Sequence, residues 1–531
     1  MMKKLIAILI LTGVMILGAC SDKSATSSEP PKQDLVLNLS SEPSSLDPGI
    51  TTSLKDGWVM EHLFEGLYTL DQEGEVVLGV AEKVDKSTDG LVYTFTIRKD
   101  AKWSDGSDVT AHDFEYAWKR ALDPNVGARY ASFLYVIKNA EAFNTGKASL
   151  EEVGVTALDD KTLKLTLEAP TPYLEKLMTI TTFYPVKKEV VEANENWTLD
   201  PSLYVTNGAF QLNKWEHDSQ LELIKNKEYY AKDEVSLEKI TFKMINDATT
   251  AYQMYETGEL DFISTIPTDQ LEAAKQKPEY IEFPTYSTAM YLFNIRKEPF
   301  NNQKVRKAFA MGIDRKALVE NVGKIGETPA FAMVPPGAET PEGDFREVGG
   351  NYFEEDYEEA KKLIAEAMEE EGWSTFPKVE LIYSTSENNK RYSEAIQEML
   401  KKNLDIDIQL GTQEWSSYLD TLGRKDYQMA RMAQSGVYID PAVNLEYFLG
   451  SGTNNRTGWI NENYDQLLKK ARVEQDETKR YELLHQAEEI LMEDLPFMPY
   501  YFLSSNYLAS PEIKGIVYYN HQPPVFKWAK K

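Results

Sequence analysis

Few residues of this chain have types and spacings that could carry out a reaction. Cys20 is the only cysteine, and the five histidines lie far apart without the spacing of metal ligands. The sequence contains no nucleophile elbow, H-E-x-x-H, C-x-x-C, phosphate-binding loop or G-x-G-x-x-G motif. Close acidic pairs such as Asp105 and Asp108 are expected by chance among 85 acidic residues. The sequence therefore predicts no catalytic site, no metal site and no cofactor.

The composition is that of a large, acidic globular protein. The 531 residues carry 57 basic and 85 acidic side chains, which gives a net charge of −28, and 42% of the residues are hydrophobic. Domains of ~150 residues would fit three or four times into this length, so a cleft between lobes is possible. The acidic balance argues against a nucleic acid partner, because phosphate binding needs a basic surface.

The first residues have the pattern of a secretion signal. Lys3 and Lys4 precede an apolar run over residues 5–17, which is shorter than the ~20 residues that span a bilayer. The run ends at Gly18-Ala19-Cys20, where small residues directly precede the cysteine. This pattern resembles a bacterial lipoprotein signal, so we expect cleavage after residues 1–19.

The same resemblance implies lipid on Cys20. Residues 20–33 are polar and contain two prolines, so they read as a flexible tether. The lipid would hold the folded part at the outer face of the cytoplasmic membrane. The alternative is an ordinary signal peptide in which Cys20 occurs by chance.

Patterns of strands and helices are mixed along the rest of the chain. Residues 34–39 and 163–167 alternate like half-buried strands, and 92–97 is rich in β-branched and aromatic residues. Apolar residues recur at helical spacing between 354 and 370, and further helices are expected around 464–471 and 478–492. The mixture predicts an α/β or α+β protein with several lobes, but periodicity alone does not set their boundaries.

A set of motifs in one colinear order covers the chain from about Asp34 to its end. They are Leu46-Asp47-Pro48, LFEGLY at 63–68, the segment 97–124, VTNGAF at 205–210, the segment 298–315, QEWSSYLD at 413–420 and NRTGW at 455–459. Together these motifs resemble the peptide-binding receptors of ABC transporters, the OppA/DppA class of solute-binding proteins.

The resemblance implies a periplasmic-binding-protein-like type II α/β fold, with two lobes joined by a two-strand hinge and an extra inserted lobe. The implied boundaries are lobe I at 34–64, 191–291 and 503–531, the inserted lobe II at 65–190, and lobe III at 292–502.

By the same resemblance, the protein is a monomeric receptor and not an enzyme. It would capture oligopeptides in the cleft and deliver them to the permease and ATPase subunits of an importer. A receptor for many peptides must hold what all peptides share, so it pairs with the ligand backbone as an added strand. Water in roomy pockets then adapts to different side chains.

The resemblance also implies a set of ligand contacts. Thr52, Ser53 and Leu54 would form one strand edge, and Ala433, Gln434 and Ser435 the opposite strand. Tyr130 and Trp415 would line side-chain pockets. Each of these residues could instead be an ordinary packing or loop residue.

One position departs from the family. The family writes the stretch that ends at Pro441 as G-W-x-x-D-Y-x-[D/E]-P, and its first acid takes the α-ammonium of the ligand. Tyr438 and Asp440 agree with this pattern, but Val437 replaces the acid and Gln434 replaces the tryptophan. A buried ammonium without a counter-charge costs several kcal/mol. Val437 should therefore hold a free peptide N-terminus poorly.

Three explanations are open. An alignment gap could make Asp440 the anchor, the amine of the ligand could bind elsewhere, or the ligand could have a blocked N-terminus, as a formylated peptide does. We favour the last two together, because Tyr438 to Pro441 match without a gap. Arg431 matches a family position that can meet a ligand carboxylate or backbone, and a structural ion pair is an equal possibility.

Other functions remain open at this point. The same architecture could carry a nickel chelate or an oligosaccharide. A lipoprotein that senses peptides without transporting them, or a membrane-anchored hydrolase, would belong to a different class. The hydrolase lacks a recognisable nucleophile and base.

Overall fold

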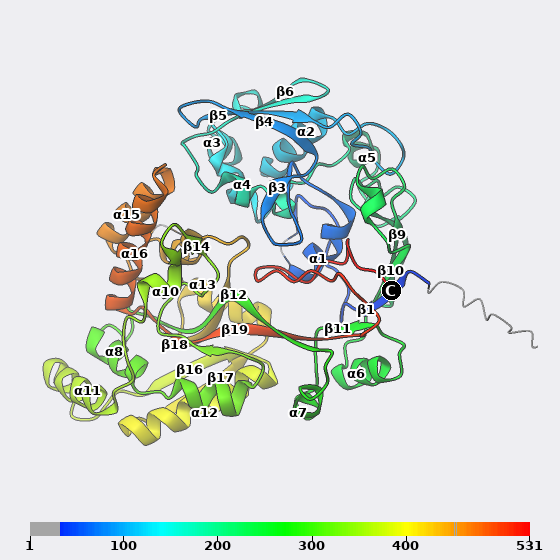
Figure 1. The fold of residues 1–531 in the computed structure, drawn as a ribbon. Coiled ribbons are helices and arrows are strands. Elements are labelled where there is room, and N and C mark those ends of the chain that lie inside the picture. Colours follow the sequence, from blue (N-terminus) through cyan, green and yellow to red (C-terminus); the bar gives the residue numbers. More distant parts are fainter. Residues whose placement is uncertain (1–31, 52, 451, 453) are drawn as a thin grey trace, which may run out of the picture. The chain divides into compact units, whose positions relative to one another are not determined.

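Two long strands form the centre of a mixed sheet in the computed structural model, which describes residues 32–51, 53–450, 452 and 454–531 (Figure 1). The strands β12 (Tyr280–Phe293) and β19 (Phe497–Ala509) pair in antiparallel fashion along most of their length. The predicted signal segment, the lipidation site Cys20 and the site residue Thr52 lie outside the described residues.

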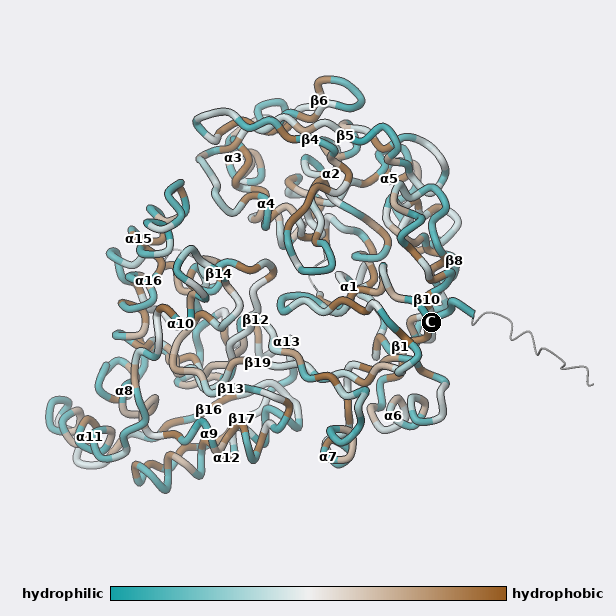
Figure 2. Tube along the Cα trace, in the orientation of Figure 1, coloured by the Kyte–Doolittle hydropathy of each residue, from teal (hydrophilic) through white to brown (hydrophobic). Residues whose placement is uncertain are grey.

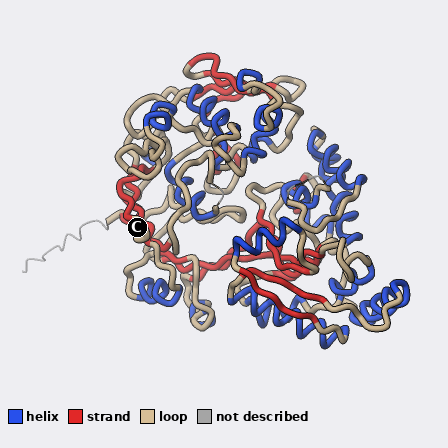
Figure 3. Tube along the Cα trace, turned by 180° about the vertical axis from the view of Figure 1, so that it is seen from behind, coloured by secondary structure: helices blue, strands red, loops and turns tan. Residues whose placement is uncertain are grey.

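The remaining strands of this sheet lie on either side of β12 and β19. On one side are β18 (Met429–Ser435), β16 (Val379–Ser384) and β17 (Ile408–Gln413). On the other side are β11 (Phe262–Ile263), β1 (Asp34–Asn38), β10 (Lys239–Lys243), β9 (Gln220–Lys225) and β8 (Phe210–Glu216). The short β13 (Thr328–Pro329) pairs with β19. Figure 3 shows these strands from behind, with helices beside them.

Both central strands pass from one hydrophobic core into another. Phe283 of β12 packs against a core built mainly from residues 35–262, whereas Tyr286 and the residues after it belong to a core within 286–501. On β19, Tyr501 belongs to the second core and Tyr507 to the first. The boundaries predicted near residues 291 and 502 therefore fall inside these two strands, close to the points where each strand changes core.

The segment predicted as the inserted lobe, 65–190, has a sheet of its own. Its order is β4 (Ala81–Lys86), β5 (Val92–Ile97), β7 (Thr162–Thr166) and β6 (Val155–Asp159), and β2 (Tyr68–Leu70) pairs with β3 (Val76–Leu78) beside it. Helix α2 (Ala111–Leu122) buries Phe114 and Trp118 and begins with a capping box between Thr110 and Asp113.

The helices predicted from periodicity are present. They are α11 (Tyr357–Glu371), α15 (Glu462–Val473) and α16 (Glu477–Asp494). Asp356 caps the start of α11, and Gly372 ends it in the left-handed region with φ at +69°. Teal and brown segments alternate along α11 in Figure 2, as expected of a helix with one buried face.

The other helices are shorter on average. Before β12 they are α1 (Leu54–Leu63), α3 (Ala140–Asn144), α4 (Leu174–Leu177), α5 (Lys188–Ala193), α6 (Ala248–Glu256) and α7 (Leu271–Ala274). In the second half they are α8 (Gln303–Met311), α9 (Arg315–Leu318), α10 (Phe345–Gly349), α12 (Glu387–Leu404), α13 (Trp415–Arg424) and α14 (Pro441–Leu445). A hairpin of β14 (Glu339–Thr340) and β15 (Gly343–Asp344) precedes α10. None of the described helices combines the length and apolar character needed to cross a bilayer.

Candidate functional site

One face of helix α1 forms the wall of a cavity. Leu54, Gly57, Trp58 and Glu61 lie at i, i+3, i+4 and i+7, so their side chains project from the same side of the helix. Ser53 caps the helix, because its hydroxyl accepts a hydrogen bond of 3.1 Å from the backbone N–H of Asp56. The wall is open at its centre, since a Cβ atom at Gly57 would meet no atom within 4 Å.

About 660 Å³ of space lies between the cavity walls, and this volume includes open solvent, so the cavity is not closed. Besides α1, its walls come from Tyr130, from Thr179 to Thr181, from Val437, and from His521 to Pro523. These segments come from all three predicted lobes. A ligand in this cavity would therefore touch parts of the chain that are distant in sequence.

The end of the chain is fixed against α1 by two buried polar contacts. The indole Nε1 of Trp58 donates to the carbonyl of Pro524 over 2.6 Å. The ring of His62 accepts at Nε2 from the N–H of Phe526 over 3.1 Å, while its Nδ1 donates to the carbonyl of Trp58. Burial lowers the pKa of His62 to about 4, so the ring stays neutral and can keep both bonds. These contacts hold His521 to Pro523 beside the helix.

Four of the residues predicted as ligand contacts line the cavity together: Ser53, Leu54, Tyr130 and Val437. The expected strand edge at Leu54 is wrong, because Ser53 caps α1 and Leu54 is its first residue. The side chain of Leu54 is 59% exposed, so its place in the site is that of an apolar side chain on a helix. Whether these residues contact a ligand stays a prediction.

The predicted strand formed by Ala433, Gln434 and Ser435 is present as the last three residues of β18. These residues pair with Ala289, Thr288 and Ser287 of β12. The N–H of Gly436 bonds to the carbonyl of Tyr286 on the β12 side, and the carbonyl of Arg431 accepts from the hydroxyl of Tyr418.

Main-chain groups alternate in direction along a strand, so the N–H and C=O of Ala433 and Ser435 point away from β12. On that outer side, β16 pairs with β18 only at Met429 and Ala430. Within the part of the chain that the structure describes, no strand covers the outer edge of β18 from Arg431 to Ser435.

Arg431 lies behind this edge and has no acidic partner among the described residues. Its Nε donates to the hydroxyl of Tyr500 over 3.1 Å and its Nη2 to that of Tyr501 over 3.3 Å. The structural ion pair that the sequence left open is therefore wrong. Arg431 does not line the cavity at α1.

Asp440 is committed to a structural role. Its carboxylate accepts from Arg480 at both oxygens, over 2.7 and 2.9 Å, and caps α14 through the N–H of Ala442. Asp440 is 1% exposed. An alignment gap that makes Asp440 the anchor of the ligand amine conflicts with this geometry, because both of its oxygens already have charged partners.

Two further predicted residues lie outside the cavity. Tyr438 is buried and its ring stacks on that of Tyr173, with centroids 6.0 Å apart. Trp415 begins α13 and is 52% exposed, with its ring 6.2 Å from that of Tyr418. Neither residue lines the cavity at α1, and their contact with a ligand stays a prediction.

Several groups of the cavity were missed by the sequence reading. The helical spacing of residues 54, 57, 58 and 61 could have indicated Glu61, whereas the placement of His521 and Gln522 follows only from the fold. Nδ1 of His521 and Nε2 of Gln522 are buried without a hydrogen-bond partner among the described residues. Burial and the charge of Lys176 lower the pKa of His521 to about 4, so this ring is neutral at pH 7. Among the described residues, no cluster of His, Cys, Asp or Glu could hold a metal ion.

Two cores linked by shared strands, with a cavity between segments of all three predicted lobes, define a lobed receptor for a small ligand. The comparisons with known proteins agree. The family model for bacterial extracellular solute-binding proteins, family 5, middle part, matches residues 75–456, and the chain belongs to this family.

The relatives include proteins of known name. The chain is 39% identical over 527 residues to the oligopeptide-binding protein OppA of Bacillus subtilis, which covers 96% of each chain. It is 39% identical over 511 residues to the dipeptide-binding protein DppE of the same organism, covering 96% of this chain and 93% of DppE. The structure of Listeria monocytogenes OppA bound to peptide matches with a TM-score of 0.80 at 32% identity, over 94% of this chain and 99% of that one. The resemblance and the fold class expected from the sequence are thus confirmed.

Proposed function

We propose that this protein is an extracytoplasmic receptor that captures oligopeptides and delivers them to an ABC importer, without catalysis of its own. The observation that carries this proposal is the uncovered outer edge of β18 at Ala433 to Ser435, two residues before the cavity wall at Val437. An extended peptide can add to such an edge as a further strand, and this bond pattern does not depend on the peptide's side chains. The names of the relatives support the same class of ligand.

The lobes divide at β12 and β19 in this proposal. Each of these strands changes from one hydrophobic core to the other, so small backbone rotations there would move lobe III against lobes I and II with little repacking of either core. Tyr173 from segment 65–190 meets Tyr438 and lies 5.2 Å below the guanidinium of Arg480. These rings form a contact that closing or opening of the lobes would change.

Placement at the membrane follows from the N-terminal residues. Cys20 carries the lipid in this proposal, residues 20–33 act as the tether, and the mature protein works as a monomer at the outer face of the cytoplasmic membrane. There it would present the loaded form to the permease subunits, and ATP hydrolysis by the ATPase subunits would drive release inward.

A substitution on the outer edge of β18 tests the proposal. Ala433→Pro removes a single N–H that points away from β12, which an edge strand tolerates. Ala433→Val keeps that N–H and serves as the matched control. Native mass spectrometry of the full chain with a tryptic digest of casein should show bound peptides for the wild type and Ala433→Val. Ala433→Pro should bind peptides roughly tenfold more weakly or worse. It loses one main-chain hydrogen bond to the ligand, and the proline ring displaces the neighbouring bonds.

Two results would contradict the proposal. One is a wild-type protein that binds no peptide from the digest but does bind a maltooligosaccharide or a nickel–histidine complex. The other is unchanged peptide binding by Ala433→Pro with its melting temperature intact, since the ligand would then not pair with this edge.

A further inference from the structure

Glu61 is the only acidic side chain among the described residues that line the cavity. It lies in the last turn of α1, on the same face as Gly57. Val437, at the position where the family carries the acid for the ligand amine, lines the same cavity from a different part of the chain. The cavity thus lacks a charge at the position where the family places it and has a charge on another wall.

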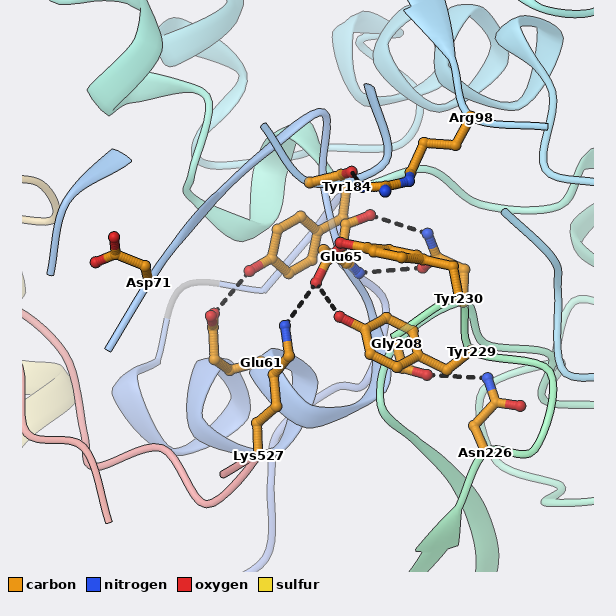
Figure 4. A network of polar contacts seen from close by, with 12 residues as sticks. Glu61, Glu65, Asp71, Arg98, Tyr184, Gly208, Asn226, Tyr229, Tyr230 and Lys527 are labelled. Carbon is orange, nitrogen blue, oxygen red and sulfur yellow. Dashed lines mark hydrogen bonds and ion pairs between the residues drawn. The ribbon is translucent and has the colours of Figure 1, made fainter. Parts of the chain in front are cut away.

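The hydrogen bonds of Glu61 and Glu65 differ, and the difference leaves Glu61 available to a ligand. Figure 4 shows Glu65 accepting from the hydroxyls of Tyr229 and Tyr230, over 2.6 and 2.5 Å, and from Nζ of Lys527 over 3.1 Å. Glu61 accepts only from the hydroxyl of Tyr184, at Oε2 over 2.6 Å. Within the described part of the chain, Oε1 of Glu61 has no hydrogen-bond partner and Glu61 has no ion pair.

Lys527 thus forms its ion pair with Glu65, and its charge acts on Glu61 without a direct contact. A carboxylate that is taken out of water is usually paired, because an unpaired buried charge is costly. Asp440 follows this rule through Arg480, and Glu65 follows it through Lys527. Glu61 has no such charged partner among the described residues, so its partner is expected to come with the ligand.

We propose that Glu61 binds the α-ammonium group of the captured peptide and supplies the counter-charge that Val437 lacks. This inference rests on the proposed function, and it selects the second of the three explanations for Val437: the amine binds elsewhere in the same cavity. A free N-terminus is then the preferred form of the ligand, and a formylated peptide is the weaker one.

The proposal implies a defined pH dependence. Burial raises the pKa of Glu61 to about 7, with the hydrogen bond from Tyr184 and the charge of Lys527 opposing the rise and Glu65 adding to it. An ammonium needs the ionised carboxylate, so affinity for a free amine should fall about tenfold per unit as pH drops below this value. It should fall again above pH ~8, where the α-amine itself loses its proton. The other titratable groups near Glu61 are Tyr519, whose pKa its charge raises, and His521, which shares the cavity wall.

Calorimetry with two peptides tests the proposal on the full chain in detergent. The probes are tetraalanine and its N-formyl twin, which differ only in the charge of the N-terminus. The wild type should bind tetraalanine more tightly near pH 7.5. Glu61→Gln should lose roughly thirtyfold or more of the affinity for tetraalanine, as expected when one partner of a buried charge pair is removed. Its affinity for the formyl twin should change by less than about threefold.

Two further variants extend the test, and the second of them keeps it informative if Glu61→Gln alters the fold. Glu61→Gln combined with Val437→Asp should regain the preference for tetraalanine, because the acid returns at the family position. Tyr184→Phe keeps the acid but removes its hydrogen bond. Its affinity for tetraalanine should therefore fall off at a higher pH than in the wild type, a shift that a merely structural role of Glu61 would not produce.

The outcomes separate this inference from the proposed function. Equal weakening of both peptides by Glu61→Gln, or a wild type that binds the formyl twin as tightly as tetraalanine, overturns the role of Glu61 and leaves peptide capture standing. If neither tetraalanine, its formyl twin nor the casein digest binds to any variant, the proposed function fails and the role of Glu61 falls with it.

Discussion

Two acidic side chains, Glu61 on α1 and Asp440 before α14, are held in contrasting ways: Asp440 is buried, whereas Glu61 is partly exposed in the cavity. Asp440 receives two charged hydrogen bonds from Arg480 and a third bond from a helix N-terminus. Among the described residues, Glu61 receives one bond, from a neutral hydroxyl. The first arrangement is complete without a ligand, and the second is not. A partly buried carboxylate that the fold leaves without an ion pair is therefore the better indicator of a binding group, and a well-paired one indicates architecture.

The largest effect should come from breaking the complete pair. Arg480→Ala leaves the carboxylate of Asp440 buried without its partner, so the free energy of unfolding should fall by about 3–5 kcal/mol. Lys479→Ala is a matched control on the same helix, because the pair of Lys479 with Asp476 is 65% and 47% exposed. This control should leave the free energy of unfolding nearly unchanged, because an exposed ion pair contributes little to stability. Urea denaturation of the unliganded protein measures both, and equal losses would erase the contrast.

Removing the charge of Glu61 should raise the free energy of unfolding, whereas Arg480→Ala should lower it. Glu61 has a raised pKa in the folded protein and an ordinary one near 4.5 when unfolded, so the folded state binds more protons between these values. The stability of the wild type should thus fall as pH rises from about 4.5 to about 7 through this group. Glu61→Gln removes that penalty, so without peptide it should raise the free energy of unfolding near pH 8 by at most ~3 kcal/mol.

The same substitution should bring little of this gain near pH 4.5, where Glu61 is protonated in the folded state and about half protonated in the unfolded state. Urea denaturation at the two pH values measures the difference. A Glu61→Gln variant that is less stable than the wild type near pH 8 would mean that Glu61 is as structural as Asp440.

A substitution at Gly57, in the open centre of the α1 wall, should change peptide affinity alone. Gly57→Leu places a side chain in the cavity, so peptide affinity should drop about tenfold or more, because a filled pocket excludes the ligand. Gly57→Ala is the control: its Cβ has no neighbour within 4 Å, and alanine favours the helix by about 1 kcal/mol. Calorimetry with tetraalanine and thermal melting check both variants. Undiminished binding by Gly57→Leu would place the ligand away from α1.

The smallest effect is expected at Val437. Val437→Asp in the wild-type background adds a second acid to a cavity that already holds Glu61, so preference for tetraalanine over its formyl twin should rise only a few-fold, roughly 1 kcal/mol. Val437→Asn has nearly the same shape without the charge and should leave the preference unchanged. A gain of a hundredfold would show instead that the family position is the sole anchor and that Glu61 contributes little.

Local patterns predicted the elements well where periodicity was strong. The strand 34–39 is β1, 92–97 is β5, and 163–167 is β7 displaced by one residue. The helix expected at 354–370 is α11. The error at Leu54 has a local cause, because Ser53 caps the helix through the backbone N–H of Asp56, whereas the family resemblance implied a strand edge there. The lobe boundaries were predicted from the family resemblance and not from periodicity.

The amino-acid sequence by itself determined the class of fold, the family and the replacement of an acid by Val437. Each of these depends on residue types and on neighbours along the chain. Only the tertiary structure decided that Asp440 is paired with Arg480, that Arg431 has no acidic partner in the described part of the chain, and that Glu61 shares a cavity with Val437 and His521. The physical reason is that charge compensation is settled between side chains tens or hundreds of residues apart. The sequence does not show whether the fold pairs a carboxylate with another side chain or leaves it for a ligand.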